Sequence, residues 1–430
     1  MRIGLLTTSF PRHRHDIAGS FVLGFARALR DQGHTIEVLA PEARDGADTA
    51  LEPGITTRPV PYLRPRAWQR TFYGAGVPDN LAHDPLAWLG LAPFSANLLL
   101  TAARRVAHWD VLVSHWALPC ALAAGAVRGN RPHIAVLHSA DVHWLGRLPG
   151  RSRWAQLIVR GADALWFVSN AQRDRFLELL PNRAALPRTL VSPMGIDLPA
   201  LAPLDAYARA EFRRRHQLQG FCVLVLGRLV AIKGVDVAVR AAAMGGMTLL
   251  VAGDGPARAE LVQLARELSV PVRWLGVVVG EDKQRWFEAV DAFVLPSRRL
   301  PDGRSEGLPC ALLEALAHGL PVVASRLDGI TELFEDDGYA HALVPPDDPA
   351  ALHAALLALG ERHAHDNRDD RDNNRDNLTR QQYGRDGRDG SRDVGRFGWS
   401  QVGARIAELL EHAETARRTD TAQGIGRSLR

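Results

Sequence analysis

Twice along this chain, short apolar strands alternate with amphipathic helices, and this repeated alternation limits the fold more than any other feature. The predicted strands of both series are the residues at about 2–8, 35–40, 110–115, 133–138 and 164–168, then 221–227, 247–252, 272–275, 291–295 and 321–324. Continuous apolar runs are typical of parallel strands whose sheet is covered on both faces. The sequence therefore predicts an α/β protein with two Rossmann-like, doubly wound domains that face each other across a cleft.

The length of 430 residues is too great for one ordinary core and supports two domains. We predict an N-terminal domain over 1–198 and a C-terminal domain over 199–360. Residues 361–396 are rich in Arg and Asp and have few apolar side chains, so they are expected to form a disordered insertion. An Arg/Asp-rich interaction arm is the alternative. A final helix over 397–415, with Ser400 as its N-cap, and a loose tail over 416–430 complete the prediction.

Composition indicates a soluble globular protein, with 46% hydrophobic and 23% charged residues. No run approaches the ~18–20 uninterrupted apolar residues that a membrane-spanning helix needs, and the first ten residues read as a strand rather than a signal peptide. The three cysteines have no pairwise spacing typical of a disulfide framework or a zinc site. We therefore expect a cytoplasmic protein without a bound metal.

The positive charge is concentrated in the first half of the chain. Residues 1–200 hold 22 Arg and no Lys against 15 acidic residues, whereas the remainder holds 30 basic and 33 acidic residues. An anionic partner is expected there, either a phosphorylated acceptor or an acidic membrane surface, and no motif supports nucleic acid. Arginines mixed with aromatic residues at 62–73 and 144–154 favour peripheral binding at the inner face of the membrane. Ordinary loop surface beside an acceptor cleft is the alternative.

The segment 305–325 places two glutamates, Glu306 and Glu314, eight positions apart around the start of a predicted helix. Gly307 allows close approach of a ligand to backbone amides, and Pro309 suits the first helical turn. Amides at a helix N-terminus attract phosphate or sugar oxygens. Two carboxylates beside such amides suit a ligand with hydroxyl groups at one end and a diphosphate at the other. Ordinary solvated glutamates on a surface helix are the alternative.

Lysine is scarce in this chain, which makes the lysine at position 233 informative. Of 52 basic residues only Lys233 and Lys283 are lysine. Lys233 lies with Arg228 in the glycine-flanked turn Gly227–Gly234, between a predicted strand and a helix. A compact ammonium and a bidentate guanidinium there could hold a diphosphate and neutralise its charge as it leaves. The alternative is a basic turn without a ligand.

Other candidates follow predicted strands. The backbone near Leu275 could contact a nucleotide base, or belong to an ordinary buried strand, and Asp254 is expected to cap the helix after its turn. His138 follows an apolar strand at the sheet edge where ligands bind, so it could contact a sugar hydroxyl or handle a proton. A structural histidine that caps a loop is the alternative. His115 and Asp141 are weaker candidates on the acceptor side.

Taken together, these segments resemble the retaining family 4 glycosyltransferases, which have the two-domain GT-B fold. The resemblance covers most of the chain outside 361–396. It rests on the ordered combination of the Pro11–Gly19 loop, His138-x-x-Asp141, Val168-Ser169-Asn170, Met194-Gly195-Ile196-Asp197, Gly227-Arg228-Leu229 with Lys233-Gly234, Gly253-Asp254-Gly255, Leu275-Gly276, Glu306-x7-Glu314 and Val344-Pro345-Pro346-Asp347.

The resemblance implies a nucleoside-diphosphate sugar as donor, no required metal, and a carbohydrate or lipid-linked acceptor. It implies that Arg228 and Lys233 bind the donor diphosphate, that Glu306 contacts the donor sugar, and that Glu314 contacts the ribose. His138 would lie near the transferring sugar, and the helix from Trp399 would cross back onto the N-terminal domain and help set cleft closure. The donor-binding set would comprise Gly19, Arg228, Lys233, Leu275, Glu306, Gly307, Leu308 and Glu314. The departure from the family pattern is a longer, more basic loop, Arg298–Arg304, which could recognise charge on donor or acceptor.

Four other functions were weighed against this one. A phosphorylase that uses pyridoxal phosphate needs a Schiff-base lysine in the core, and neither lysine suits that role. A dehydrogenase needs a Gly-x-Gly-x-x-Gly turn after its first strand, which is missing. A sugar-nucleotide epimerase on the same fold, and a non-catalytic module that binds sugar nucleotides, remain open.

Overall fold

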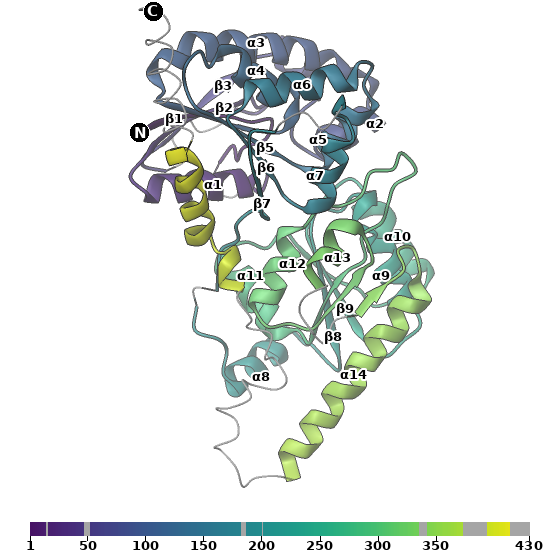
Figure 1. The fold of residues 1–430 in the computed structure, drawn as a ribbon. Helices are drawn as coiled ribbons and strands as arrows, with labels where there is room; N and C mark the ends of the chain where they lie inside the picture. The colour runs from purple at the N-terminus through teal and green to yellow at the C-terminus, as the bar shows by residue number, and fades with distance from the viewer. Residues whose placement is uncertain are drawn as a thin grey trace, which may run out of the picture. The chain divides into compact units, whose positions relative to one another are not determined.

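The computed structural model describes residues 1–13, 16–46, 52–181, 186–199, 201–334, 342–372 and 394–412. The chain divides into two compact units, each built around one parallel sheet (Figure 1). Unit 1 comprises Met1–Ile196 with the segment that begins at Phe397, and unit 2 comprises Asp197–Arg396. The predicted fold class, two doubly wound α/β domains, is confirmed. The division falls after Ile196 instead of after residue 198.

Unit 1 has a seven-stranded sheet in the order β3-β2-β1-β4-β5-β6-β7, and every neighbouring pair is parallel. Its strands are β1 Arg2–Leu6, β2 Thr35–Pro41, β3 Ile55–Val60, β4 Val111–His115, β5 His133–Leu137, β6 Ala164–Phe167 and β7 Arg188–Val191. Its helices are α1 Ser20–Asp31, α2 Val77–His83, η2 Pro85–Gly90, α3 Leu91–Arg105, η3 Val106–His108, η4 Ala117–Ala121, α4 Leu122–Val127, α5 Ser139–Arg147, α6 Arg151–Gly161 and α7 Asn170–Leu177. A short 3-10 turn, η1 Arg66–Trp68, follows β3.

Unit 2 has a six-stranded parallel sheet in the order β10-β9-β8-β11-β12-β13. Its strands are β8 Cys222–Leu226, β9 Thr248–Ala252, β10 Arg273–Gly276, β11 Ala292–Leu295, β12 Val322–Ser325 and β13 Ala342–Val344. Its helices are α8 Ala206–Arg215, η6 Ala231–Lys233, α9 Val235–Ala242, α10 Arg258–Glu267, α11 Gly280–Ala289, α12 Cys310–Ala317, α13 Asp328–Phe334 and α14 Pro349–Asp372, with the 3-10 turn η8 Val394–Phe397.

The strands that periodicity did not predict are β3, β7 and β13, and all three lie at sheet edges. Edge strands are covered on fewer sides, so they need no continuous apolar run. The residues of β7 are all exposed or partly exposed, and those of β3 alternate between buried and exposed positions. The central strands β4, β5, β6 and β11 are fully buried, which is why their apolar runs were recognisable.

The strand order reverses at one place in each sheet. In unit 1 the reversal lies between β1 and β4, and in unit 2 it lies between β8 and β11. Ligands of open α/β sheets bind outside the carboxyl ends of the strands at such a switch point. The loops that follow β8 and β11 therefore form the place in unit 2 where a ligand site is expected, and these loops contain Lys233 and Glu306.

The helix over 399–412 packs on unit 1 beside helix α1 (Figure 1, yellow). A Cβ atom on Gly24 of α1 would lie 2.2 Å from the Trp399 ring, and one on Gly195 would lie 2.3 Å from the same ring. The Ile196 amide donates to the Phe397 carbonyl at 2.9 Å. Two glycines separated by more than 170 residues thus leave room for one indole, which anchors the C-terminal helix.

Replacing Trp399 with alanine is expected to remove this anchor and to lower the unfolding free energy of unit 1 by about 3 kcal/mol. This value is at the lower end of the usual cost of removing a large aromatic side chain, because the indole is only partly buried. Urea denaturation measures the loss, and hydrogen exchange at the α1 amides locates it. Gln401→Ala, at an exposed position of the same helix, is the control. Equal stability of the two variants would contradict the anchoring role.

Two predictions about the C-terminal region need correction. Helix α14 continues to Asp372, well into the segment predicted to be disordered from residue 361. No Gly or Pro interrupts residues 361–372, so nothing in the backbone stops the helix. The last helix begins at residue 399, so Ser400 is inside it and is not its N-cap. The remaining insertion, 373–393, and the predicted helix end and tail, 413–430, lie outside the described residues.

Candidate active site

Three strand ends in unit 2 are held together by backbone contacts at glycines. The Gly227 amide donates to the Ala252 carbonyl at 3.0 Å, and the Gly253 amide donates to the Gly276 carbonyl at 2.6 Å. Gly253 has φ 131°, and a Cβ atom on it would lie 1.9 Å from the Gly227 carbonyl oxygen. Only glycine allows this approach. The turns after β8, β9 and β10 are thereby fixed side by side.

The turn after β8 is also tied to the loop after β11. Gly234 has φ 60°, and a Cβ atom there would lie 1.9 Å from the Pro296 carbonyl oxygen. The Arg298 amide donates to the Ile232 carbonyl at 2.9 Å. The two loops that flank the switch point of unit 2 are therefore in direct backbone contact.

Lys233 and Glu306, which these two loops contribute, form an ion pair. Lys233 Nζ lies 2.7 Å from Glu306 Oε2. The lysine side chain is 16% exposed and the glutamate side chain 13% exposed, so the pair is shielded from bulk water while remaining reachable. The hydrocarbon part of Lys233 lies over Gly227, where a Cβ atom would be 3.5 Å from Cε. The structure thus brings together the two residues that the sequence singled out.

The second glutamate pairs with the second lysine. Lys283 Nζ, on α11, lies 2.8 Å from Glu314 Oε1, on α12. Burial raises the pKa of Glu314, and the charge and hydrogen bond of Lys283 oppose that rise. The two lysines of the chain are therefore each bound to one glutamate of the Glu306-x7-Glu314 motif. The sequence analysis assigns no ligand role to Lys283, although the scarcity of lysine is a signal that points to it.

Helix α12 begins directly beside the first pair. Pro309 is its N-cap, and no side chain caps its first amides. Gly307 and Leu308 precede the cap and are partly exposed. Burial raises the pKa of the Cys310 thiol to about 12, so this cysteine is not a nucleophile at neutral pH. The start of the helix offers backbone amides to a ligand instead.

The basic loop before Glu306 has its arginines engaged within unit 2. Arg298 donates hydrogen bonds to Asp236, at 2.7 Å for the shorter one, and forms an ion pair with Asp347 at 2.6 Å, and Arg304 pairs with Asp302 at 2.7 Å. Arg299 lies 3.1 Å from Asp328 in an exposed pair. These contacts hold the loop before Glu306 in place.

The other predicted residues of unit 2 are more peripheral. Arg228 is exposed on the turn after β8, and Leu275 is partly exposed in β10. Asp254 was expected to cap a helix, but its carboxylate accepts from the Gly255 amide at 2.8 Å, and helix α10 begins at Arg258 after the N-cap Ala257. Asp254 therefore stabilises the turn and not the helix.

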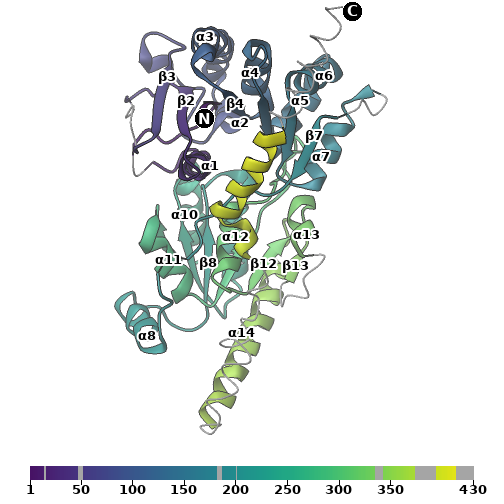
Figure 2. The ribbon, with the colours of Figure 1, turned by 60° about the vertical axis from the view of Figure 1, so that its left-hand side comes forward.

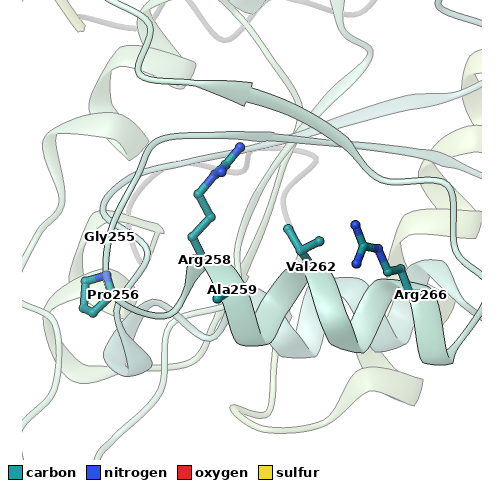
Figure 3. A pocket seen from close by; sticks show the side chains of 6 residues that line it. All are labelled: Gly255, Pro256, Arg258, Ala259, Val262 and Arg266. Atoms are coloured by element: carbon teal, nitrogen blue, oxygen red, sulfur yellow. The ribbon is translucent and has the colours of Figure 1, made fainter.

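A hollow of about 450 Å³ lies along helix α10 (Figure 3). It is lined by Gly255, Pro256, Arg258, Ala259, Val262 and Arg266. Arg258, Val262 and Arg266 are spaced four residues apart and share one face of the helix. None of the predicted donor-binding residues lines this hollow, so the candidate site rests on the ion pairs at the switch point.

In unit 1 the loop after β1 leads to Gly19, which precedes helix α1. Gly19 has φ 64°, and a Cβ atom on it would lie 2.4 Å from the Ser9 carbonyl oxygen. A larger residue would push this loop apart from the helix start. The left-handed backbone at Gly19 therefore keeps the loop after β1 packed against the start of α1.

His115 and His138 lie at the ends of the neighbouring strands β4 and β5 and contact each other. His115 Nδ1 lies 3.1 Å from His138 Nε2, and the rings stack with their centroids 5.4 Å apart. Burial lowers the pKa of His138 to about 3 and the pKa of His115 well below its usual value. Two neutral rings can share this hydrogen bond, one as donor and one as acceptor. His115 is fully buried, so the direct acceptor contact predicted for it is wrong.

Asp141 holds the start of helix α5 in place. Its carboxylate accepts from the amides of Ala117 at 2.7 Å, His138 at 2.9 Å and Val142 at 2.8 Å. Burial raises the pKa of Asp141, and these amides oppose the rise. The structure corrects its prediction as an acceptor-side residue, because the carboxylate is buried and bound to backbone. Asp141 acts on His138 by fixing its position.

The neutral state of His138 has a measurable consequence. In the unfolded chain this histidine takes up a proton near pH 6.5, whereas in the folded protein it does so only near pH 3. Its contribution to stability is therefore present above pH 6.5 and is lost as the pH falls. Between pH 7 and pH 5 the loss is about 2 kcal/mol. We expect a His138→Gln variant to lose that much less stability than the wild type over this range.

Chemical denaturation at several pH values, from pH 7 to pH 5, measures this difference. His115 acts in the same direction and Asp141 in the opposite one, and both are present in the two proteins. The difference between the two proteins in how the free energy of unfolding changes with pH therefore reports the contribution of His138. If the free energy of unfolding fell equally with pH in the two proteins, His138 would not be neutral in the folded state.

Comparison with known proteins identifies the family to which this chain is similar. Residues 18–195 match the family model "Glycosyl transferase 4-like domain", and residues 220–362 match "Glycosyl transferases group 1". The GDP-mannose-dependent alpha-(1-6)-phosphatidylinositol monomannoside mannosyltransferase of Mycolicibacterium smegmatis is 33% identical over 315 residues, which are 70% of this chain and 76% of that protein. The D-inositol 3-phosphate glycosyltransferase of Acidothermus cellulolyticus is 28% identical over 366 residues, or 79% of this chain and 77% of that protein.

A solved structure supports the architecture. The HepE protein of Anabaena, in complex with UDP and glucose, superposes with a TM-score of 0.66 at 19% identity. The match covers 96% of this chain and 100% of the other. At this identity the likeness bears on the fold alone, and that fold is GT-B.

Proposed function

The chain belongs to the glycosyl transferases group 1, and from this premise we propose that it is a retaining glycosyltransferase whose acceptor is a lipid-linked or polysaccharide precursor. Transfer of a sugar from a nucleotide sugar is the activity of the family. Retention, the acceptor and the roles of individual residues are our proposals.

The Lys233–Glu306 pair carries the proposal. It lies at the switch point of the unit 2 sheet, where α/β folds bind ligands, and beside the uncapped start of α12. A diphosphate bound by Lys233 and Arg228 would face the amides of Gly307 and Leu308, and Glu306 would then contact the donor sugar. Glu314 would accept hydrogen bonds from the ribose hydroxyls, and the Lys283 ammonium favours the charged form of its carboxylate. Leu275 and Gly19 would border the base and the diphosphate through their backbones.

In the reaction, the bond between the anomeric carbon and the diphosphate oxygen breaks while the bond to the acceptor oxygen forms. The negative charge that develops on the diphosphate is stabilised by Lys233, Arg228 and the α12 amides, which are fixed before the reaction. The proton of the acceptor hydroxyl passes to a phosphate oxygen on the same face, and the anomeric configuration is retained. The neutral His138 would hydrogen-bond a hydroxyl of the transferring sugar.

The acceptor proposal is supported by charge and by relatives. The first 200 residues hold 22 Arg against 15 acidic residues, which favours a phosphorylated acceptor. The names of the two relatives give phosphatidylinositol monomannoside and D-inositol 3-phosphate as their acceptors. We propose that the enzyme acts in the cytoplasm at the inner face of the cell membrane, where a lipid-linked precursor would be met.

A donor screen tests the proposal. Purified protein is mixed with UDP-, GDP-, ADP- and dTDP-sugars, and thermal shift and nucleoside-diphosphate release are recorded. We expect one donor to stabilise the protein and to be hydrolysed slowly, and we expect Glu306→Gln to abolish release. The absence of a response to every donor, with extracted lipid-linked sugars also present, would overturn the proposal. Conversion of the donor to another sugar nucleotide without acceptor would identify an epimerase, and binding without any turnover a non-catalytic module.

A further inference from the structure

One stretch of unit 1, Pro85–Ala162, is almost free of negative charge. It contains eight arginines but only two acidic residues, Asp110 and Asp141. Asp110 is bound to Arg2, and Asp141 is buried against backbone amides. Two of its arginines pair with carboxylates from outside the stretch, Arg105 with Glu37 and Arg128 with Asp163. Arginine still exceeds carboxylate in this stretch, so the surface that it builds is basic.

The same stretch exposes large apolar side chains. Helices η2 and α3 form a continuous apolar segment, Pro85–His108, of which only 28% is buried in its most apolar part. On η2, Leu86, Trp88 and Leu89 are each about half exposed, at 52%, 49% and 53%. The exposed stripe of α3 is apolar except for one arginine at its C-terminal end. It consists of Ala92, Ala96, Leu99, Leu100, Ala103 and Arg104. Outward faces of surface helices are normally polar, so this stripe calls for a partner.

By length and composition Pro85–His108 is the segment, among the described residues, that could cross a membrane. Its packing argues for another arrangement. Phe94, Leu98 and Ala102 on the inner face of α3 are fully buried in a core cluster with Leu112 of β4. Spanning a membrane would pull these side chains out of the core. The segment is instead placed to lie along an interface, with one face on the protein and the other outward.

Helix α6 continues this surface. Helices α3, α4 and α6 lie in a row (Figures 1 and 2), which spans about 20 Å at the usual helix spacing. On α6 the exposed residues Arg153, Trp154, Leu157 and Arg160 share one helix face, and Arg151 is exposed at the start of the helix. Trp88 of η2 contacts Trp144 of α5 with ring centroids 6.3 Å apart, and α5 packs against α6. The surface of η2, α3 and α6 thus exposes arginine, tryptophan and leucine side chains together.

We propose that this surface, formed by η2, α3 and α6, binds an anionic lipid membrane. Leucine and tryptophan side chains would enter the boundary between headgroups and acyl chains, and the arginines would contact anionic headgroups. Nucleic acid would not need the exposed leucines, and a second copy of this chain would bring the exposed arginines Arg104, Arg153 and Arg160 against their own counterparts. The inference concerns binding and does not depend on the proposed function.

Co-sedimentation with vesicles tests this proposal. We expect the wild-type protein to bind vesicles of phosphatidylcholine with phosphatidylglycerol far more than vesicles of phosphatidylcholine alone, and to release them as salt increases. Changing Arg153 and Arg160 to glutamate is expected to weaken binding at least about twentyfold. Leu99→Gln with Leu100→Gln is expected to weaken it by about tenfold or more, since both leucines are exposed and their loss leaves the core intact.

Matched controls separate this surface from net charge and from catalysis. Arg214→Glu with Arg215→Glu changes the charge equally on unit 2, and Met244→Gln with Val277→Gln removes exposed apolar side chains there. Both controls, and Glu306→Gln, should bind vesicles like the wild type. Equal binding to neutral and anionic vesicles, or equal losses in the controls, would overturn the proposal. The proposal would also be overturned if the wild-type protein did not bind vesicles but associated with itself, and if the Leu99→Gln/Leu100→Gln variant abolished that association.

Discussion

Replacing Lys233 with methionine is expected to lower the rate of sugar transfer by about 10²–10³-fold while the protein remains folded. Methionine keeps the hydrocarbon chain that lies over Gly227 and removes the ammonium that pairs with Glu306 at 2.7 Å. An electrostatic group that is positioned before the reaction and acts on developing charge typically contributes this much. Steady-state kinetics with the donor found in the screen, at saturating acceptor, measures kcat and KM separately.

Two further variants distinguish a role in catalysis from a role in the ion pair alone. Lys233→Arg keeps the charge, but its planar fork does not reproduce a compact ammonium, so we expect partial activity. The chain has arginine at 50 of its 52 basic positions, so this variant tests why position 233 is lysine instead. In the double variant Lys233→Met/Glu306→Gln, the losses should be less than multiplicative, because the two residues act as a unit. Full activity of Lys233→Met would contradict the site assignment.

Replacing Lys283 with methionine is expected to weaken donor binding by about tenfold or more, the equivalent of ~1.4 kcal/mol. Burial already raises the pKa of Glu314, and Lys283 is the group that opposes this rise. Without Lys283 the pKa of Glu314 rises further, so Glu314 takes up its proton at a higher pH. Protonated Glu314 is a weaker acceptor for the ribose hydroxyls. Donor affinity of the variant should therefore fall with decreasing pH earlier than that of the wild type.

Calorimetric titration of the nucleoside diphosphate between pH 8 and pH 6 measures this shift. A second readout is the preference for the ribonucleotide over its 2′-deoxy and 3′-deoxy analogues, which should shrink in Lys283→Met and stay near wild type in Lys283→Arg. Arg214→Met, which removes an exposed ion pair on α8, is the control. An unchanged pH profile together with an unchanged ribose preference would show that Lys283 has no role in donor binding.

The core of each unit could be predicted because its signal is local. Central strands such as β4 and β11 are buried on both faces, so their sequence is continuously apolar. Glycines at strand ends, such as Gly227 and Gly253, are visible as turns, and Lys233 stood out because lysine is scarce. The edge strands β3 and β7 were not predicted, because partial exposure removes the apolar run.

Other features depend on which distant segments the sheet order brings together. Lys283 and Glu314 are 31 residues apart, and no periodicity joins them, since their contact follows from the packing of α11 beside α12. His115 and His138 meet because β4 and β5 are neighbours, and that contact buries one ring and changes the role expected for it. The amino-acid sequence by itself determined the two α/β units and the loops that contain candidate chemistry, because burial and turn geometry act on neighbouring residues. Only the tertiary structure decided which charges are paired and which carboxylates are bound to backbone, because these depend on strand order and helix packing.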